Sequence, residues 1–163
     1  MANDELIYIL MKKKTKFVVE PFDDIRIIGI NTGMYDYQLA WNLNKELKIE
    51  LVKYKNITSD DENFFSFYLY DAGENSNTFN LVALSNEETR WVLFSPQTDY
   101  LLIIRNYIKD SDFLSLLQKI KSIPKVVHAY VVDLGKNSKI DTILEDIELH
   151  EMNIFDEMNY RQK

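Results

Sequence analysis

The chain contains no cysteine and only two histidines, His128 and His150. The absence of cysteine excludes disulfide bonds, thiolate metal sites and cysteine nucleophiles, and it is typical of a protein in a reducing compartment. Two histidines are too few for a histidine-rich metal centre. We therefore expect a cytoplasmic protein that carries no metal and no cofactor.

Basic charge is also scarce. The chain has 19 Lys and Arg against 26 Asp and Glu, which gives a net charge of −7. This balance disfavours binding to a polyanion, because nucleic-acid-binding proteins usually present a basic stripe. The one dense basic run consists of Lys12, Lys13, Lys14 and Lys16. We interpret it as a solvated surface, and phosphate contact through these lysines is the alternative.

The sequence has no long apolar run, and glycine and proline are few. No stretch approaches the ~20 apolar residues of a membrane span, so we expect no membrane insertion. Four glycines and three prolines in 163 residues leave no room for a flexible linker, and no internal repeat occurs. We expect one domain at residues 16–150, with a flexible N-terminal extension at 1–15 and a polar C-terminal tail at 151–163.

Apolar and aromatic residues are abundant, at 46% and 13% of the chain, which is enough for a core. Segments rich in Ile, Val, Phe and Tyr, each bounded by polar clusters, predict strands. These predicted strands are residues 16–20, 25–30, 49–55, 64–70, 78–84, 91–94, 99–105 and 126–132.

Helical spacing of apolar residues predicts helices at 35–48, 111–123 and, more weakly, 140–150. The stripe of the first helix contains Tyr37, Ala40, Trp41, Asn44 and Leu47, and is widened by Leu39 and Leu43. We expect Asn31 or Thr32 to cap the first helix and Asp110 or Ser111 to cap the second. Pro124 ends the second helix, because the residue before a proline avoids the α region.

Several predicted strands are apolar on both faces. In the strand at 64–70, alternation places Phe65, Phe67 and Leu69 on one face and Phe64, Tyr68 and Tyr70 on the other. The helices 35–48 and 111–123 can cover one face of the sheet. The other face needs a cover too, from the third helix, the N-terminal strand or another chain.

The order of the elements predicts an α+β fold with a mixed or antiparallel sheet and two main helices. The closing strand–helix–strand unit, residues 100–132, predicts a parallel crossover. The arrangement resembles a ferredoxin-like plait with an extra central hairpin at residues 64–84. Its final unit also resembles the end of ACT domains, which sense small molecules.

The sequence contains no catalytic constellation, and we predict that the protein is not an enzyme. The loop Gly29–Gly33 is neither a GxGxxG motif nor a P-loop, and no GxSxG occurs. We interpret this loop as a tight turn and His128 as structural; the alternative is a ligand loop formed by Asn31, Thr32 and Gly33 with His128. Asp133 is expected to cap the loop that follows the last strand, and the alternative is that it orients a partner side chain.

Three segments, "IGINTGMYDYQLAWNLNKELKIEL" (28–51), "DYLLII" (99–104) and "IKSIPKVVHAYVVD" (120–133), resemble the IPExxxVDY family of small bacterial proteins. The shared pattern is an Asp-Tyr before a leucine-rich helix, an Asn-Lys near the end of that helix, and a late Ile-Pro followed by an Ala-Tyr strand. The naming motif is mostly missing, because Val92, Leu93 and Phe94 occupy its Ile-Pro-Glu positions. The resemblance implies a cytoplasmic bacterial protein and no particular activity.

The abundance of aromatic strands without catalytic groupings predicts a non-enzymatic interaction or adaptor protein that binds a protein partner or forms a homodimer. The expected anchors are aromatic, because such side chains dominate binding interfaces: Trp41, Trp91, Tyr68 and Tyr70. One alternative is a small-molecule-sensing, ACT-like module. Another is a factor associated with ribosomes or RNA processing through Lys12–Lys16.

Overall fold

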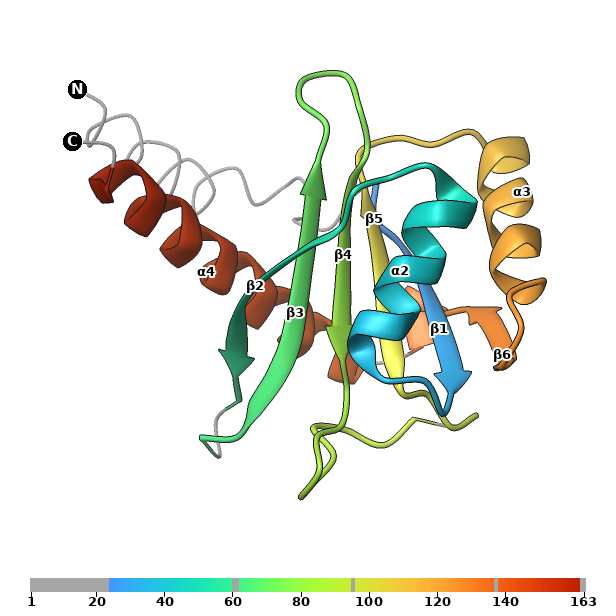
Figure 1. Ribbon diagram of the computed structural model, residues 1–163, viewed down its shortest axis with the longest axis horizontal. Helices are drawn as coiled ribbons and strands as arrows, with labels where there is room; N and C mark the ends of the chain where they lie inside the picture. Colours follow the sequence, from blue (N-terminus) through green and yellow to red (C-terminus); the bar gives the residue numbers. More distant parts are fainter. Residues whose placement is uncertain (1–23, 60–61, 95, 137, 162–163) are drawn as a thin grey trace.

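The computed structural model describes residues 24–59, 62–94, 96–136 and 138–161. The expected N-terminal extension, its lysine run and the predicted strand 16–20 lie outside these residues. The described part has six strands and three α-helices, with a 3-10 turn at Leu134–Lys136 (Figure 1). The strands are β1 (Arg26–Thr32), β2 (Val52–Thr58), β3 (Phe64–Asp71), β4 (Thr78–Ala83), β5 (Tyr100–Arg105) and β6 (Val126–Val131); the helices are α2 (Asp36–Leu47), α3 (Asp110–Lys121) and α4 (Ser138–Arg161).

The strands form one open sheet in the order β2-β3-β4-β5-β1-β6, and all neighbouring strands are antiparallel. This confirms the predicted α+β class with an antiparallel sheet. Both β5 and β6 pair with β1, which lies between them, so β5 and β6 run parallel to each other. The unit β5–α3–β6 is therefore a crossover between parallel strands, as expected, although the two strands are not neighbours.

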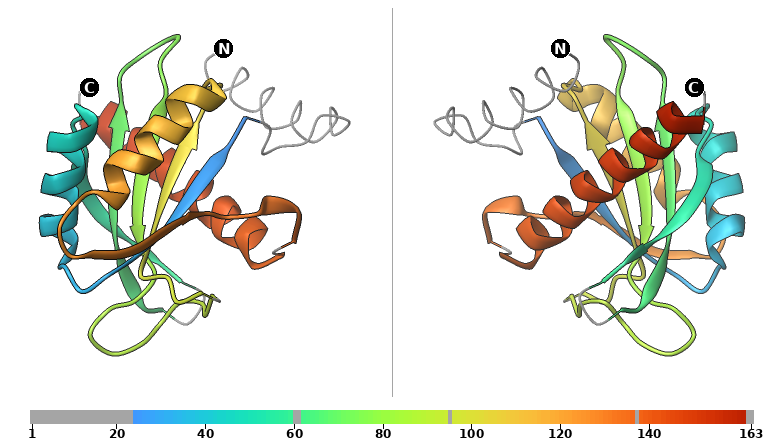
Figure 2. Two further views of the ribbon diagram at one scale, coloured as in Figure 1. Left: turned by 90° about the vertical axis from the view of Figure 1, so that its right-hand side faces the viewer. Right: turned by 90° about the vertical axis from the view of Figure 1, so that its left-hand side faces the viewer.

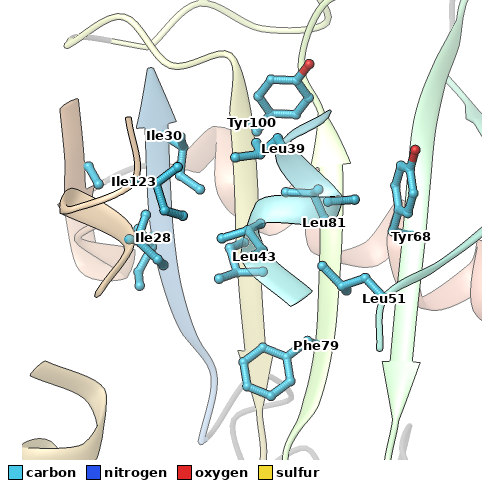
Figure 3. Close-up of a cluster of buried hydrophobic side chains, with 14 of the residues drawn as sticks. Ile28, Ile30, Leu39, Leu43, Leu51, Tyr68, Phe79, Leu81, Tyr100 and Ile123 are labelled. Carbon is cyan, nitrogen blue, oxygen red and sulfur yellow. The ribbon is translucent and has the colours of Figure 1, made fainter. Parts of the chain in front are cut away.

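The first core lies between the sheet and the helices α2 and α3. From α2, Leu39 and Leu43 are fully buried, and they lie over the sheet with Ile28 and Ile30 of β1 (Figure 3). Phe113 of α3 is fully buried in the same core. Alternation along β1 and β5 supplies every second side chain to this face. Tyr68 and Tyr70 of β3 belong to the same face, as the alternation in the sequence predicted.

The second core lies on the opposite face and is covered by α4 (Figure 2). Phe65, Phe67 and Leu69 of β3 point into it, which confirms the other half of the predicted alternation. The helix contributes residues at helical spacing, Ile140, Ile143, Leu144, Ile147 and Ile154. Of the three possible covers for this face, the described structure shows the third helix.

The predicted strand 91–94 is wrong. Next to it the structure has an isolated bridge between Ser85 and Arg90, and the Trp91 amide donates to the carbonyl of Leu84. The segment has strand-like composition because Trp91, Val92 and Phe94 pack against the second core. It cannot join the sheet there, because β4 and β5 are already paired on both sides.

The third helix is longer than predicted, since α4 continues to Arg161 through the segment expected to be a polar tail. Glu151 and Ile154 are buried, so the core extends beyond the expected boundary at residue 150. Acidic residues on the outer face of α4 gave the segment its polar composition. The prediction of a polar tail gave too little weight to the few apolar residues on the inner face.

Both predicted helix caps are wrong. Tyr35 is the N-cap of α2, and its amide donates to the side-chain Oε1 of Gln38 at 3.0 Å. Thr32 accepts instead from the amide of Met34 within the preceding turn. Lys109 is the N-cap of α3, whereas Asp110 forms an ion pair with Arg26 at 2.7 Å. The expected loop cap by Asp133 is confirmed, because its Oδ1 accepts from the amide of Gly135 at 3.0 Å.

Truncation of Ile143 tests the packing of α4 on the sheet. Ile143→Ala should lower the free energy of unfolding by about 2–5 kcal/mol, the usual cost of a cavity at a fully buried isoleucine. Leu149→Ala on the exposed side of the same helix is the matched control, and should change it by less than about 0.5 kcal/mol. Denaturant unfolding measures both; equal effects would show that α4 does not dock through Ile143.

Candidate functional site

A shallow apolar groove of about 440 Å³ runs beside α2. It is here called the α2 groove, and its lining consists of Met34, Tyr37, Gln38, Trp41, Asn42, Pro124 and Lys125. Pro124 and Lys125 come from the turn between α3 and β6, which the chain brings beside the N-terminal half of α2. Residues more than eighty positions apart in the sequence therefore share one surface.

Exposed aromatic rings form the wall of the α2 groove. The helix turns Leu39, Ala40 and Leu43 into the core, so Tyr37 and Trp41, one turn apart, face outward and are each 62% exposed. This corrects the predicted stripe, which had placed both rings on the same side as Ala40. Tyr35 stacks on Tyr37 with 5.8 Å between ring centroids.

Cationic groups border these rings. The Lys45 ammonium lies 5.2 Å from the ring centroid of Trp41, one helical turn away, and Lys125 is among the residues that line the groove. The polar side chain between them is satisfied internally, since the Asn42 amide donates to the carbonyl of Gln38 at 2.8 Å. The α2 groove is therefore an apolar surface with a positive rim, on a chain whose net charge is negative.

A second groove, of about 460 Å³, lies where β1 ends and α2 begins and is here called the β1 groove. It is more polar than the α2 groove. Its lining includes Thr32, Gly33, Asp36, Ser66, Asp99 and Tyr100, with Phe64, Asn86 and Glu87 among the remaining residues. The exposed ring of Phe64 forms part of this lining.

Asp99 organises one side of the β1 groove. Its Oδ2 accepts from the amide of Thr32 at 3.0 Å, and its Oδ1 pairs with the guanidinium of Arg90 at 2.8 Å. In addition, the backbone amide of Asp99 donates to the carbonyl of Ile30, and the backbone carbonyl of Asp99 accepts from the amide of Leu84. The Asp99 carboxylate therefore connects the end of β1, through Thr32, to Arg90 in the loop before β5.

Asp36 holds the other side of the groove. It accepts from the Tyr68 hydroxyl at 2.9 Å and from the Lys53 ammonium at 3.2 Å. Burial raises the pKa of Asp36, but hydrogen bonds from Ser66, Tyr68 and Lys53 outweigh it, so the net pKa lies below its ordinary value. Burial also raises the pKa of Tyr100, whose hydroxyl donates to the Met34 carbonyl at 2.8 Å. Tyr100 therefore stays neutral in the groove.

The structure brings the residues of the predicted ligand loop together in two pairs. Thr32 and Gly33 line the β1 groove. Asn31 and His128 are instead cross-strand partners of β1 and β6, and the exposed His128 ring stacks on Tyr130, which packs against the second core. Of the four residues, Thr32 and Gly33 are the ones that line the β1 groove, and the ligand loop remains a prediction.

A bulge in the pairing of β1 with β6 also changes the faces of β6. His128 was expected on the same face as Val126, but Val126 packs on the first core, because the register shifts between Asn31 and Thr32. Tyr130 lies against Gly29, where an added Cβ would come within 2.6 Å of the ring. Glycine at this position leaves the space that the tyrosine ring occupies.

The four expected aromatic anchors have different environments. Trp41 is exposed in the α2 groove, whereas Trp91 is half-buried and stacks on Phe65 with 5.2 Å between centroids. Tyr68 is only 5% exposed and Tyr70 is half-buried beside Phe79. Among these four, Trp41 is the ring that a partner can reach over most of its surface.

Sequence reasoning missed Asp36, Asp99 and the exposed Tyr35 and Tyr37. Both acids begin the Asp-Tyr pairs of the family pattern, and this was the available signal. Nothing in the spacing showed that they converge, since their meeting depends on the pairing of β1 with β5. In the same pattern, Asn44 has a structural role: its side chain both accepts from and donates to the backbone of Leu51.

A buried polar cluster lies on the opposite face, beneath α4. Glu151 accepts from the amide of Asn80, which is fully buried, and from the guanidinium of Arg105 at 2.6 Å. Within the described residues, Asn80 Oδ1 and Arg105 Nε have no hydrogen-bond partner. The described ranges contain no group of three or more His, Asp or Glu side chains that could hold a metal ion. No described helix is both long and apolar enough to span a bilayer.

Comparison with known proteins returns no match, either among protein families, among curated proteins or among solved structures. The site and the fold are therefore interpreted from their own geometry.

His150 supplies a test of burial beneath α4. Its Nε2 lies 2.9 Å from the carbonyl of Lys55, and its ring packs edge-on against Phe67. Burial lowers the pKa of His150 below 6.5, more than the Lys55 carbonyl and the nearby acids raise it. The unfolded chain then binds more protons than the folded chain. The contribution of His150 to the free energy of unfolding is therefore complete above pH ~6.5 and is lost as the pH falls from there toward the pKa of His150 in the folded chain.

The free energy of unfolding should therefore decrease between about pH 7.5 and 5, and His150→Gln should reduce that decrease while keeping an N–H donor. His128→Gln is the matched control, because His128 is the other histidine of the chain and is exposed. Denaturant unfolding at several pH values measures all three proteins. An equal pH dependence in wild type and His150→Gln would contradict the prediction.

Proposed function

We propose that the protein is a non-enzymatic interaction or adaptor protein that binds a protein partner through the α2 groove. The observation that carries the proposal is the cluster of exposed rings, Tyr35, Tyr37 and Trp41, on a helix whose other side is fully packed. Large aromatic side chains that face water are unusual unless they contact something, and tryptophan and tyrosine dominate binding energy at interfaces.

The chemistry of the groove defines the partner. Lys45 places positive charge beside the Trp41 ring, and a second lysine, Lys125, lines the groove, so the surface is complementary to a segment that presents an apolar side chain flanked by carboxylates. The dimensions suit one or two side chains of such a segment. The groove is preformed by the packing of α2 and by the Ile123–Pro124 turn, which reduces the entropic cost of binding.

Four further interpretations remain proposals. The sheet order with α2 and α3 on one face supports a ferredoxin-like plait into which the hairpin β3–β4 is inserted. Cytoplasmic location and membership of the IPExxxVDY family are supported by the sequence pattern alone. The association with RNA through Lys12–Lys16 concerns residues outside the described part.

A second candidate function is small-molecule sensing in the β1 groove, and the observation that favours it is the convergence of Asp36, Asp99 and Thr32 around one polar hollow. A ligand with several hydroxyl or amino groups suits these acceptors. Binding to the folded state alone would raise the unfolding temperature, so a panel of polar metabolites in thermal denaturation tests it. No shift across the panel would remove this candidate.

Substitution of Trp41 tests the proposed function. A partner is first captured from cells of the source organism, then purified, and its affinity for wild type and Trp41→Ala is measured by calorimetry. Trp41→Ala should weaken binding about tenfold or more, because a central tryptophan commonly contributes more than about 1.4 kcal/mol. Leu114→Ala, which removes an exposed leucine of α3 outside the groove, is the matched control and should bind as wild type does.

Both variants should unfold at the wild-type temperature, because both side chains are exposed. An unchanged affinity of Trp41→Ala for the purified partner would contradict the proposed function. So would the failure of any captured protein to bind directly after purification.

A further inference from the structure

Helix α4 crosses the sheet obliquely, and its contacts show which way each of its flanks faces (Figure 2). On one flank, His150 and Glu157 both contact Lys55 of β2, the strand at one edge of the sheet. The next residue after His150, Glu151, is turned by about 100° around the helix and contacts Arg105 of β5. The flank beyond Glu151 therefore faces away from β2, toward the half of the sheet that contains β5 and β1.

This flank, here called the α4 flank, has an acidic half and an apolar half. It consists of five residues at helical spacing, Asp141, Glu145, Glu148, Met152 and Phe155. Phe155 is 40% exposed, and Met158, one turn further along, is 39% exposed. Neighbouring large apolar side chains that the core leaves partly in water mark a surface that another segment can cover.

The chain enters the described structure beside the α4 flank. Arg26 opposes Ile104 in the pairing of β1 with β5, so Ile25 lies next to Arg105 in the same register. Ile25 packs against the second core, which is on the α4 side of the sheet. Arg105 in turn contacts Glu151. The residues that precede Ile25 therefore leave the sheet next to the α4 flank.

The sequence of these preceding residues is complementary to the α4 flank. Residues 6–11 form a run of six apolar side chains, and Lys12, Lys13, Lys14 and Lys16 follow directly. An apolar run of this kind needs a surface that removes it from water. The helix α4 contains seven Asp and Glu against one Lys and one Arg, so it also supplies the charge opposite to that of the lysine run.

The order of the two halves sets a direction. Along α4 the acidic half of the flank comes first and the apolar half second, whereas in residues 6–16 the apolar run comes first. The patterns match when the two segments are antiparallel. Length permits this, because the nine residues from Lys16 to Ile25 can span up to about 30 Å, and the flank from Asp141 to Phe155 is about 21 Å long.

We propose that residues 6–16 dock on the α4 flank, antiparallel to the helix. The apolar run covers Met152, Phe155 and Met158, and the lysines face Asp141, Glu145 and Glu148. Burial of the two apolar surfaces supplies the attraction, and the opposite charges fix the direction. The lysine run then contacts the acids of its own chain and not the phosphates of a nucleic acid.

The inference does not rest on the proposed function. The α4 flank lies on the face of the sheet that α4 covers, and the α2 groove lies on the opposite face (Figure 2). Trp41→Ala should therefore leave the docking unchanged. Loss of partner affinity in Trp41→Ala without docking of residues 6–16 would refute this inference and keep the proposed function, and the reverse pattern would do the opposite.

The first experiment uses the absence of cysteine from the chain. Tyr8→Cys and Thr15→Cys each carry one nitroxide label in the full chain, and the label broadens the amide signals near it in a magnetic resonance spectrum. The label at position 8 should broaden residues 152–158 most, and the label at position 15 should broaden residues 141–148 most. Leu114→Cys on α3, which covers the opposite face, is the matched control and should broaden both regions less.

A mixture of two preparations separates contacts within one chain from contacts between two copies. One preparation carries the nitroxide without the isotope, and the other carries the isotope without the nitroxide. Broadening of α4 in the mixture would show that a second copy occupies the flank, and this would overturn the proposal. A reversed pattern of the two labels, or no broadening of α4, would overturn it as well.

The second experiment measures how strongly docking protects the flank. The thiol of Phe155→Cys is modified by a thiol reagent in the full chain. Adding Ile7→Asp and Ile9→Asp should raise the rate of modification about tenfold or more, because the burial of one isoleucine corresponds to at least this factor. Leu149→Cys, exposed elsewhere on the same helix, is the matched control and should react equally fast with and without the two aspartates.

Charge reversal tests the lysine run by the same measurement. Lys12→Glu/Lys13→Glu/Lys14→Glu should raise the rate at Phe155→Cys about threefold or more, because several exposed ion pairs are lost together. The control changes the net charge equally on the opposite face, at three exposed lysines, Lys109, Lys119 and Lys121.

Unchanged rates in both sets of N-terminal variants, or an equal acceleration by the control, would contradict the proposal. Circular dichroism shows whether each variant is folded. If the aspartate variants unfold, the lysine variants decide the question, because their substitutions place no charge in the apolar run.

Discussion

The sheet has apolar side chains on both faces, and neither face can remain in water. This constraint determines the layers of the molecule, because α2 and α3 must cover one side and α4 the other (Figure 2). Each helix presents one apolar stripe to the sheet. Some large apolar side chains stay exposed on all three helices, among them Leu114 on α3 and Leu149 on α4, and on α2 they are the aromatic rings of Tyr37 and Trp41. Those exposed rings are notable because the packing of the core does not require them.

Local patterns in the sequence were sufficient to predict most helices and strands and the two faces of β3, because alternation and helical spacing involve only a few neighbouring residues. The predictions are wrong where contacts between segments distant in the sequence determine the structure. Trp91 has strand-like neighbours, but β4 and β5, the strands on either side of its segment in the sequence, are already paired on both sides. Val126 changes face because of one bulge, and Trp41 faces outward although its spacing also suits a buried stripe. The β1 groove could not be foreseen, because strand pairing unites Asp36 with Asp99 across sixty residues.

The acids of the β1 groove contrast with the rings of the α2 groove. Asp36 and Asp99 are each held by several donors, including a cation, and these bonds connect β1, α2, β3 and the loop before β5. Their charge is already engaged in holding the grooves in shape. Trp41 has a cation on its face and water around it, so it can exchange solvent for a partner at low cost. This difference is why the interaction hypothesis takes precedence.

Beneath α4, Glu151 meets Asn80 of β4 and Arg105 of β5 in a layer that is mainly apolar. Isoleucines alone would let the helix slide along the sheet, because a shift of one turn, about 5.4 Å, exchanges one apolar contact for another. The same shift would move the Glu151 carboxylate into apolar surroundings and leave Arg105 without its counter-ion, at a high desolvation cost. We infer that this buried polar cluster, together with the bond between His150 and the Lys55 carbonyl, selects one position for α4 among several that have equivalent apolar contacts.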